Sequence, residues 1–112
     1  MPVAETTREG LQIDAATLAA VGELCRRYHV RRLDIFGSAV RADFDPARSD
    51  VDLLVTFDDA WKTHYADTYF GLLAGLEDLF ERKIDLLTER SIENPYLRQA
   101  IDSERKPLFV AP

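Results

Sequence analysis

Residues 37–55, GSAVRADFDPARSDVDLLV, join a Gly-Ser turn to two aspartates that open an apolar run. The run at 51–57 is rich in β-forming residues and bounded by polar ones, which predicts a strand. Side chains alternate between the faces of a strand, so Asp50 and Asp52 should project to the same side, with backbones about 7 Å apart. Two carboxylates held this close repel each other unless a cation lies between them. Mg²⁺, a hard cation that prefers carboxylate oxygens, meets that need.

A third carboxylate follows in the segment KIDLLTE at 83–89, which predicts another strand. An unpaired charge inside an apolar strand is costly, so Asp85 needs either an ion-pair partner, for which Lys83 and Arg32 are the alternatives, or a function. If this strand lies beside 51–57, Asp85 faces the same cavity as the two earlier aspartates. Three acidic groups on two strands predict a two-metal site, whose ions, roughly 3.5–4 Å apart, activate the attacking oxygen and stabilise the leaving one.

The turn before the aspartates has the composition of an anion site. Gly37 lets the backbone approach a ligand closely. Backbone N–H groups of a turn, together with the Ser38 hydroxyl, make a concave anion site, and a short helix beginning after this serine would add positive potential. Arg41 can add a charge-assisted contact to phosphate. A Gly-Ser pair alone is most often a plain turn, and an Asp-x-Asp pair a cap or a surface pair, but the combination predicts a nucleoside triphosphate and phosphoryl-type transfer.

The rest of the chain alternates helical and strand patterns. The expected elements are a helix capped by Asp14 and ending near Tyr28, a strand at 30–36, an amphipathic helix at 61–80, a helix after Asn94-Pro95 and a short edge strand at 107–110. With the strands at 51–57 and 83–89, this order predicts an α/β or α+β domain. Gly71 and Gly75 share one face of the 61–80 helix, which predicts close packing against the sheet.

Length and charge limit the function classes. The 112 residues have room for one domain, with 1–13 as an N-terminal extension and 14–112 as the domain. The net charge is −6, from 20 acidic and 14 basic residues, whereas a long nucleic-acid track needs a basic face. The one basic segment, RRYHVRR at 26–32, is interpreted as a helix end whose cations complement the dipole, or alternatively as a docking patch for an acidic or phosphate-bearing partner.

Cysteine usage and targeting signals point to the cytoplasm. The single cysteine, Cys25, has no partner for an internal disulfide and lies at an apolar position of the first helix, so we expect a core residue. The first ten residues do not resemble a signal peptide, and no apolar run approaches the roughly 20 residues that span a bilayer.

The segment FGSAVRADFDPARSDVDLLV at 36–55 resembles the signature of the nucleotidyltransferase superfamily typified by DNA polymerase β. The chain is most similar to the minimal nucleotidyltransferases that form the antitoxin half of toxin–antitoxin pairs with HEPN-domain ribonucleases. The resemblance runs from about residue 14 to 110. It implies a palm-like fold with a small mixed sheet flanked by helices.

The resemblance also implies roles for individual residues. Gly37 and Ser38 match the pair that holds the triphosphate, and Arg41 matches the arginine of the common Gly-Ser-x-x-Arg pattern. Asp50 and Asp52 match the paired metal-binding aspartates. The third metal-site residue is matched by Asp85, which in the family helps to activate the acceptor hydroxyl. Departures from the family lie in the connecting turn, with Ala42 where many members have glycine and eleven residues rather than ten between the serine and the first aspartate.

Similar antitoxins transfer AMP from ATP to a tyrosine of the partner toxin and so silence its ribonuclease. The resemblance therefore implies a Mg²⁺-dependent adenylyltransferase, with two ions as cofactors, ATP as substrate and a HEPN toxin as partner, and without membrane or direct nucleic-acid binding. A chain this short has little left to bind an acceptor, which should come from a docked protein. The alternatives are an antitoxin that acts by masking the toxin, and nucleotidyl transfer to a small molecule.

Overall fold

A computed structural model describes residues 11–41, 50–58 and 64–112 of the chain. In chain order its elements are α1 (Ala15–Arg27), β1 (Val30–Phe36), the 3-10 helix η2 (Gly37–Val40), β2 (Val51–Phe57), α2 (Tyr65–Phe80), β3 (Ile84–Thr88), the 3-10 helix η4 (Glu89–Ser91), α3 (Pro95–Glu104) and β4 (Lys106–Val110). The four strands form one sheet in the order β3-β2-β1-β4. The predicted α/β class and the predicted order of elements are confirmed.

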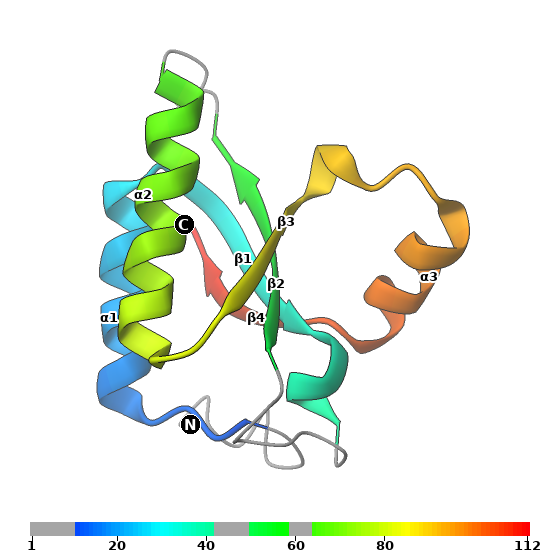
Figure 1. The fold of residues 1–112 in the computed structure, drawn as a ribbon, viewed down its shortest axis with the longest axis horizontal. Coiled ribbons are helices and arrows are strands. Elements are labelled where there is room, and N and C mark those ends of the chain that lie inside the picture. The colour runs from blue at the N-terminus through cyan, green and yellow to red at the C-terminus, as the bar shows by residue number, and fades with distance from the viewer. Residues whose placement is uncertain (1–10, 42–49, 59–63) are drawn as a thin grey trace.

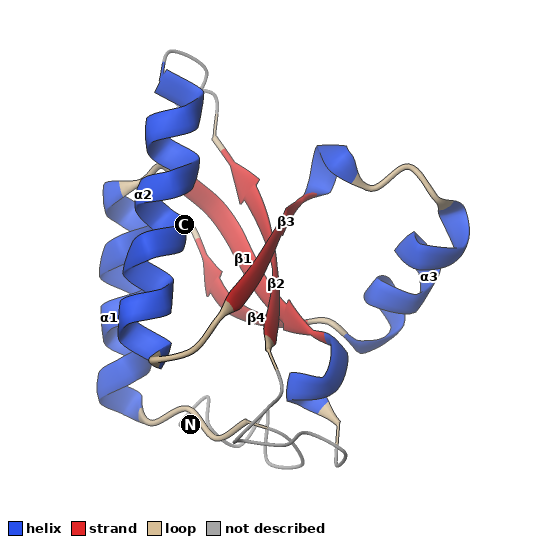
Figure 2. Ribbon diagram, viewed as in Figure 1, coloured by secondary structure: helices blue, strands red, loops and turns tan. Residues whose placement is uncertain are grey.

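The sheet separates the helices into two groups. Helices α1 and α2 lie on one side, and α3 lies on the other (Figure 1). Strand β1 pairs antiparallel with β2 and β4, whereas β2 and β3, which α2 connects, are parallel. Figure 2 shows α2 as the crossover between the two parallel strands. The sheet is therefore mixed, with β3 and β4 at its edges.

Local sequence signals set the helix ends. The Asp14 carboxylate accepts a hydrogen bond from Thr17 N at 2.7 Å, as a helix N-cap does. The Asn94 side chain caps α3 by accepting from the backbone N–H groups of Tyr96 and Leu97. The helix predicted at 61–80 begins at Tyr65, and its first three predicted residues lie outside the described ranges.

Two apolar clusters divide the strands by face. The larger cluster joins alternate β-strand residues to α1 and α2; it includes Leu33, Ile35, Leu53, Val55, Leu72 and Leu76. The smaller cluster lies on the α3 side of the sheet and consists of Phe36, Leu54 and Ile101. The segment before α1 also packs on the domain, because Ile13 is buried and Leu11 N donates to Ala39 O at 2.7 Å.

The glycines of α2 face another helix. A Cβ atom placed on Gly71 would come within 2.5 Å of the Tyr28 ring, and one on Gly75 within 2.8 Å of Leu24. Both neighbours belong to α1 or its C-cap. The close packing that the sequence predicted is therefore present, but its partner is α1, and the predicted partner, the sheet, was wrong.

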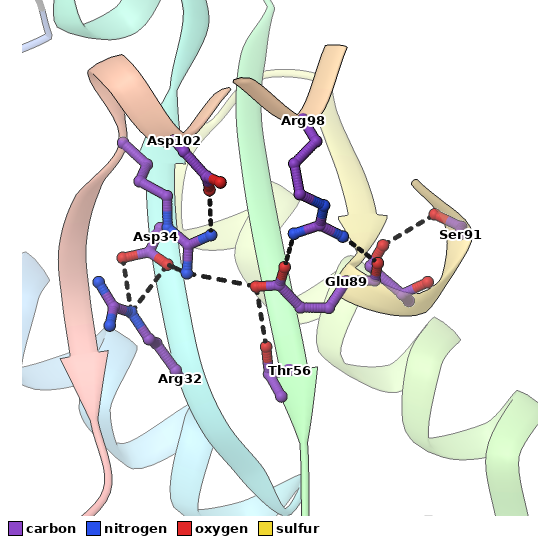
Figure 3. Close-up of polar contacts among 9 residues, drawn as sticks. Arg32, Asp34, Thr56, Glu89, Ser91, Arg98 and Asp102 are labelled. Carbon is purple, nitrogen blue, oxygen red and sulfur yellow. Dashed lines mark hydrogen bonds and ion pairs between the residues drawn. The ribbon is translucent and has the colours of Figure 1, made fainter. Parts of the chain in front are cut away.

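An ion-pair network ties α3 to the α3 side of the sheet. Asp34, which is 1% exposed, pairs with Arg32 at 2.9 Å and with Arg105 at 3.0 Å. Arg105 also contacts Glu89 at 3.2 Å, and Arg98 pairs with the same glutamate. Figure 3 shows these contacts together with the weaker hydrogen bond from Thr56 to Glu89. A buried carboxylate is tolerable only with such partners, so the network fixes where α3 ends.

Helix α2 covers part of the outer side of β3. The Tyr69 hydroxyl donates to Leu86 O at 2.6 Å, and Ile84 N donates to the Glu77 carboxylate at 3.3 Å. Alternate residues of a parallel strand turn their backbone groups to opposite sides. Since Val51 N of β2 donates to Lys83 O, the groups of Ile84 and Leu86 are those that face away from β2.

Two further findings concern the thiol and the membrane. Cys25 is buried in the larger cluster, as predicted, and burial raises the pKa of its thiol to about 12. None of the helices in the described part of the chain combines the length and the apolar character that crossing a membrane requires.

The α1–α2 contact predicts opposite outcomes for glycine-to-alanine changes. Gly71→Ala should lower the free energy of unfolding by roughly 1–3 kcal/mol, because the added methyl overpacks the contact with the Tyr28 ring. Gly22→Ala in α1 is the matched control, since its Cβ would meet only the flexible Arg26 side chain at 3.5 Å. It should be neutral or stabilise by up to about 1 kcal/mol through helix propensity. Urea denaturation measures both, and equal effects would contradict the packing argument.

Candidate active site

The β2–β3 register brings two of the predicted aspartates together. Asp52 and Asp85 are Cα partners in the parallel pair, so their side chains lie side by side on one face of the sheet. They project from the α3 side of the sheet, because their neighbours Leu53 and Leu86 belong to the cluster on the opposite side. Asp52 is half-buried, whereas Asp85 is exposed on the edge strand.

Asp50 lies next to this pair. It adds to the negative charge that Asp52 experiences, and its carboxylate lies 4.0 Å from Lys83 Nζ. Arg32 pairs with Asp34 instead. The alternative that Lys83 or Arg32 neutralises Asp85 is therefore wrong, since both cations contact other aspartates.

The carboxylate cluster changes the protonation of Asp52. The pKa of Asp52 is raised from 3.8 to about 6, and burial is the largest cause. The negative charge of Asp85, a hydrogen bond to it when one of the pair is protonated, and the charge of Asp50 add to the rise, whereas Arg41 opposes it. A shift in this direction means that the charged form is disfavoured where it lies. The site thus holds negative charge that it does not itself neutralise.

Gly37 forms the boundary between the carboxylates and the turn. Its φ of +71° lies in the left-handed region, and a Cβ atom there would be 2.3 Å from Asp52 Oδ2. Both the backbone conformation and the carboxylate exclude a larger residue. The glycine is thus required by the adjoining aspartate as well as by the turn.

The predicted anion site holds a carboxylate of the chain itself. Gly37 N donates to Glu104 Oε1 at 3.0 Å, and Arg41 Nη1 lies 3.0 Å from Glu104 Oε2. Ser38 is partly buried in η2, and its carbonyl oxygen accepts from Arg41 N at 3.0 Å. Helix η2 begins at Gly37, so the predicted start after Ser38 was wrong. We name the Gly37 N–H and the Arg41 guanidinium the anion cradle.

A cavity of about 430 Å³ opens beside the carboxylates. Its lining combines the two paired aspartates with apolar and aromatic groups: Phe36, Asp52, Tyr69, Ile84, Asp85, Leu86 and Leu87. Burial, with smaller effects of Tyr65 and Asp85, raises the pKa of the Tyr69 phenol. Tyr69 therefore stays protonated and is a hydrogen-bond donor at neutral pH.

The carboxylate oxygens of these aspartates suit a divalent metal, although the three carboxylates do not converge on one point. Within the described ranges, no three His, Cys, Asp or Glu side chains converge closely enough to hold one ion. Asp52 and Asp85 provide adjacent carboxylate oxygens, and the raised pKa of Asp52 reports a charge cluster that a cation would relieve. Asp50 would have to turn from Lys83 to join them.

Residues that act over long sequence separations were not predicted. Glu104 lies 67 residues from Gly37, and no pattern in the sequence connects them. Asp34 had a weak signal, because it shares a strand face with Arg32 in the segment 30–36. For the basic segment 26–32, the structure places Arg26 and Arg27 in the last turn of α1, as the helix-end interpretation requires.

Comparisons with known proteins match nearly the whole chain. Residues 19–108 match the family described as nucleotidyltransferase domain. A candidate protein adenylyltransferase of Methanocaldococcus jannaschii is 31% identical over 96 residues, which cover 79% of this chain and 94% of that protein.

Solved structures share the fold. A candidate minimal nucleotidyltransferase superposes with a TM-score of 0.69 at 32% identity and covers 93% of this chain and 94% of that one. A complex of a tri-AMPylated Shewanella oneidensis HEPN toxin with an MNT antitoxin aligns with a TM-score of 0.56 at 20% identity, over 86% of this chain and 71% of that one. At this identity the second likeness concerns the fold alone.

The raised pKa of Asp52 predicts a pH-dependent stability of the metal-free protein. Folding favours the protonated acid between pH 3.8 and about 6, so stability falls as pH rises through this range. Asp52→Asn removes this penalty. After discounting for solvent screening, we expect the variant to be about 1–2 kcal/mol more stable than the parent at pH 8 and equal to it near pH 3.5.

Chemical denaturation in EDTA at both pH values measures this difference. Asp78→Asn, an exposed site on α2, is the control and should show no such divergence. A parent protein that is more stable than Asp52→Asn at pH 8 would contradict the presence of a destabilising carboxylate cluster.

Proposed function

The chain belongs to the nucleotidyltransferase domain family, and on that premise we propose that it transfers AMP from ATP to a hydroxyl group, expected to be that of a tyrosine, on a partner HEPN ribonuclease toxin and so neutralises it. The reaction uses Mg²⁺, expected as two ions held by Asp50, Asp52 and Asp85. The triphosphate group of ATP binds to Gly37, Ser38 and Arg41.

One observation carries the proposal. Asp52 lies beside Asp85 in the parallel register on one side and occupies, on the other, the space that a Gly37 side chain would need. A carboxylate cluster and an anion cradle are therefore contiguous. Clustered carboxylates favour a bound cation and the anion cradle favours a phosphate, and nucleotidyl transfer requires both at the same place.

Each group of the chain has a task in this reaction. The anion cradle binds and orients the triphosphate through the Gly37 N–H and the Arg41 guanidinium. Asp85, which is exposed, accepts the proton of the acceptor hydroxyl as the hydroxyl oxygen attacks the α-phosphorus. The bond from that phosphorus to the pyrophosphate oxygen breaks, and pyrophosphate leaves. When bound, Mg²⁺ neutralises the phosphate charge that develops.

The cavity supports a protein tyrosine as the acceptor. Its lining places the aromatic ring of Tyr69 and apolar Leu87 beside Asp85. An aromatic acceptor can pack on such a wall while its hydroxyl reaches the carboxylate. The relative from Methanocaldococcus jannaschii, described as a candidate protein adenylyltransferase, is consistent with a protein substrate.

The proposal is tested by weighing the partner. The protein, ATP and Mg²⁺ are incubated with the proposed partner, a HEPN ribonuclease toxin, and intact-mass spectrometry follows the mass of the toxin. We expect a mass increase of one or more AMP groups. Asp85→Asn should slow transfer by roughly 10²–10⁴-fold, the range for a lost general base, and Asp52→Asn should abolish detectable transfer while keeping the fold.

Asp78→Asn changes an exposed carboxylate of α2 that lines a groove with α1, and this variant should transfer at the parent rate. A toxin whose mass never changes would refute the proposal. If Asp52→Asn still neutralises the toxin in a ribonuclease assay, the chain acts by masking its partner instead.

A further inference from the structure

We propose that Glu104 is an internal competitor of the nucleotide: its carboxylate occupies the anion cradle in the nucleotide-free protein, and the triphosphate must displace it. The inference rests on the proposed function and concerns what sets nucleotide affinity at the same site.

The geometry of the contact is that of a bound anion. The two carboxylate oxygens of Glu104 accept from different donors, Oε1 from Gly37 N and Oε2 from Arg41 Nη1, each at 3.0 Å. Both donors are the groups that would bind phosphate oxygens. A carboxylate and a phosphate oxygen seek the same charge-assisted hydrogen bonds, so one set of donors cannot fully serve both.

The backbone of Glu104 is held in place by its neighbour. Arg105 contacts Asp34 at 3.0 Å, Glu89 at 3.2 Å and Asp102 at 2.9 Å, and its side chain is only 16% exposed. The end of α3 therefore cannot withdraw without breaking a partly buried ion-pair network. Displacement takes place by rotation of the Glu104 side chain, which is 27% exposed and faces an Arg41 side chain that is 51% exposed.

The position of Glu104 suits competition with the triphosphate better than a role in orienting Arg41. A group that only oriented Arg41 would need no contact with the backbone N–H of Gly37, yet Glu104 takes both donors at once. Its negative charge also lies next to a turn that adjoins Asp52. Binding of a triphosphate thus has to overcome this carboxylate, and the carboxylate sets a threshold concentration for ATP.

The test measures ATP affinity and kinetics in matched variants. Glu104→Gln keeps the size and one acceptor oxygen but removes the charge, so we expect ATP to bind roughly 3- to 30-fold more tightly by calorimetry, the order of one ion pair with a charged hydrogen bond. The KM for ATP should fall by a similar factor while kcat stays unchanged. Inorganic tripolyphosphate, which needs no acceptor, should show the same gain in affinity.

Two further variants separate the contact from general charge. Glu93→Gln removes the same charge from the exposed segment before α3 and should leave affinity unchanged. Glu104→Asp keeps the charge but is too short to reach both donors, so its affinity should lie between those of the parent and Glu104→Gln. Thermal melting verifies that each variant is folded.

The outcomes distinguish the two proposals. Unchanged or weaker binding of ATP and tripolyphosphate by Glu104→Gln would overturn the competitor role, and weaker binding would assign Glu104 to the support of Arg41. If instead the variant binds ATP more tightly but no toxin is modified by any form of the chain, the proposed function fails while the role of Glu104 stands.

Discussion

The parallel register of β2 and β3 is the constraint on which the site depends. It sets Asp52 directly beside Asp85, and the antiparallel partner on the other side of β2 sets Asp52 beside Phe36, the residue before the glycine turn. A slip by one residue would turn the aspartates toward the apolar cluster under α1 and α2. Burial of the apolar strand residues under α1 and α2 therefore favours this register, although neither helix supplies one of the predicted metal ligands.

The two faces of the sheet have different requirements. The face under α1 and α2 is stabilised by apolar burial and specifies the fold. The face toward α3 carries charged side chains beside the smaller apolar cluster, from Asp34 and its arginines to the aspartates of β2 and β3. Such a surface is stable only where each charge finds a partner, and Asp52 is the residue for which the partners are other carboxylates. This local conflict is what separates a candidate catalytic group from the satisfied ion pairs on the same face of the sheet.

Local patterns predicted the fold and much of the site, whereas long-range contacts could not be read from the sequence. The caps Asp14 and Asn94 and the β-forming run at 51–57 depend on neighbours within a few residues. Asp50 and Asp52 were predicted to share a side because side chains alternate along a strand, and the glycine turn was predicted from its composition and from the family resemblance. The partner of Gly37 and Arg41 is a glutamate more than sixty residues away, and its place is fixed by the buried pair of Arg105 with Asp34. Gly71 likewise packs against Tyr28, the C-cap of α1. The sequence therefore predicted α2 but not the helix against which its glycines pack.

The cover that α2 gives to β3 has a consequence for how another protein can approach. With Leu86 O and Ile84 N already bonded to Tyr69 and Glu77, an incoming extended peptide cannot dock by strand addition at this edge without first breaking both bonds. An acceptor that reaches Asp85 must present its side chain from a loop or a helix end. Recognition at this edge would then depend on the shape of the partner and not on backbone pairing.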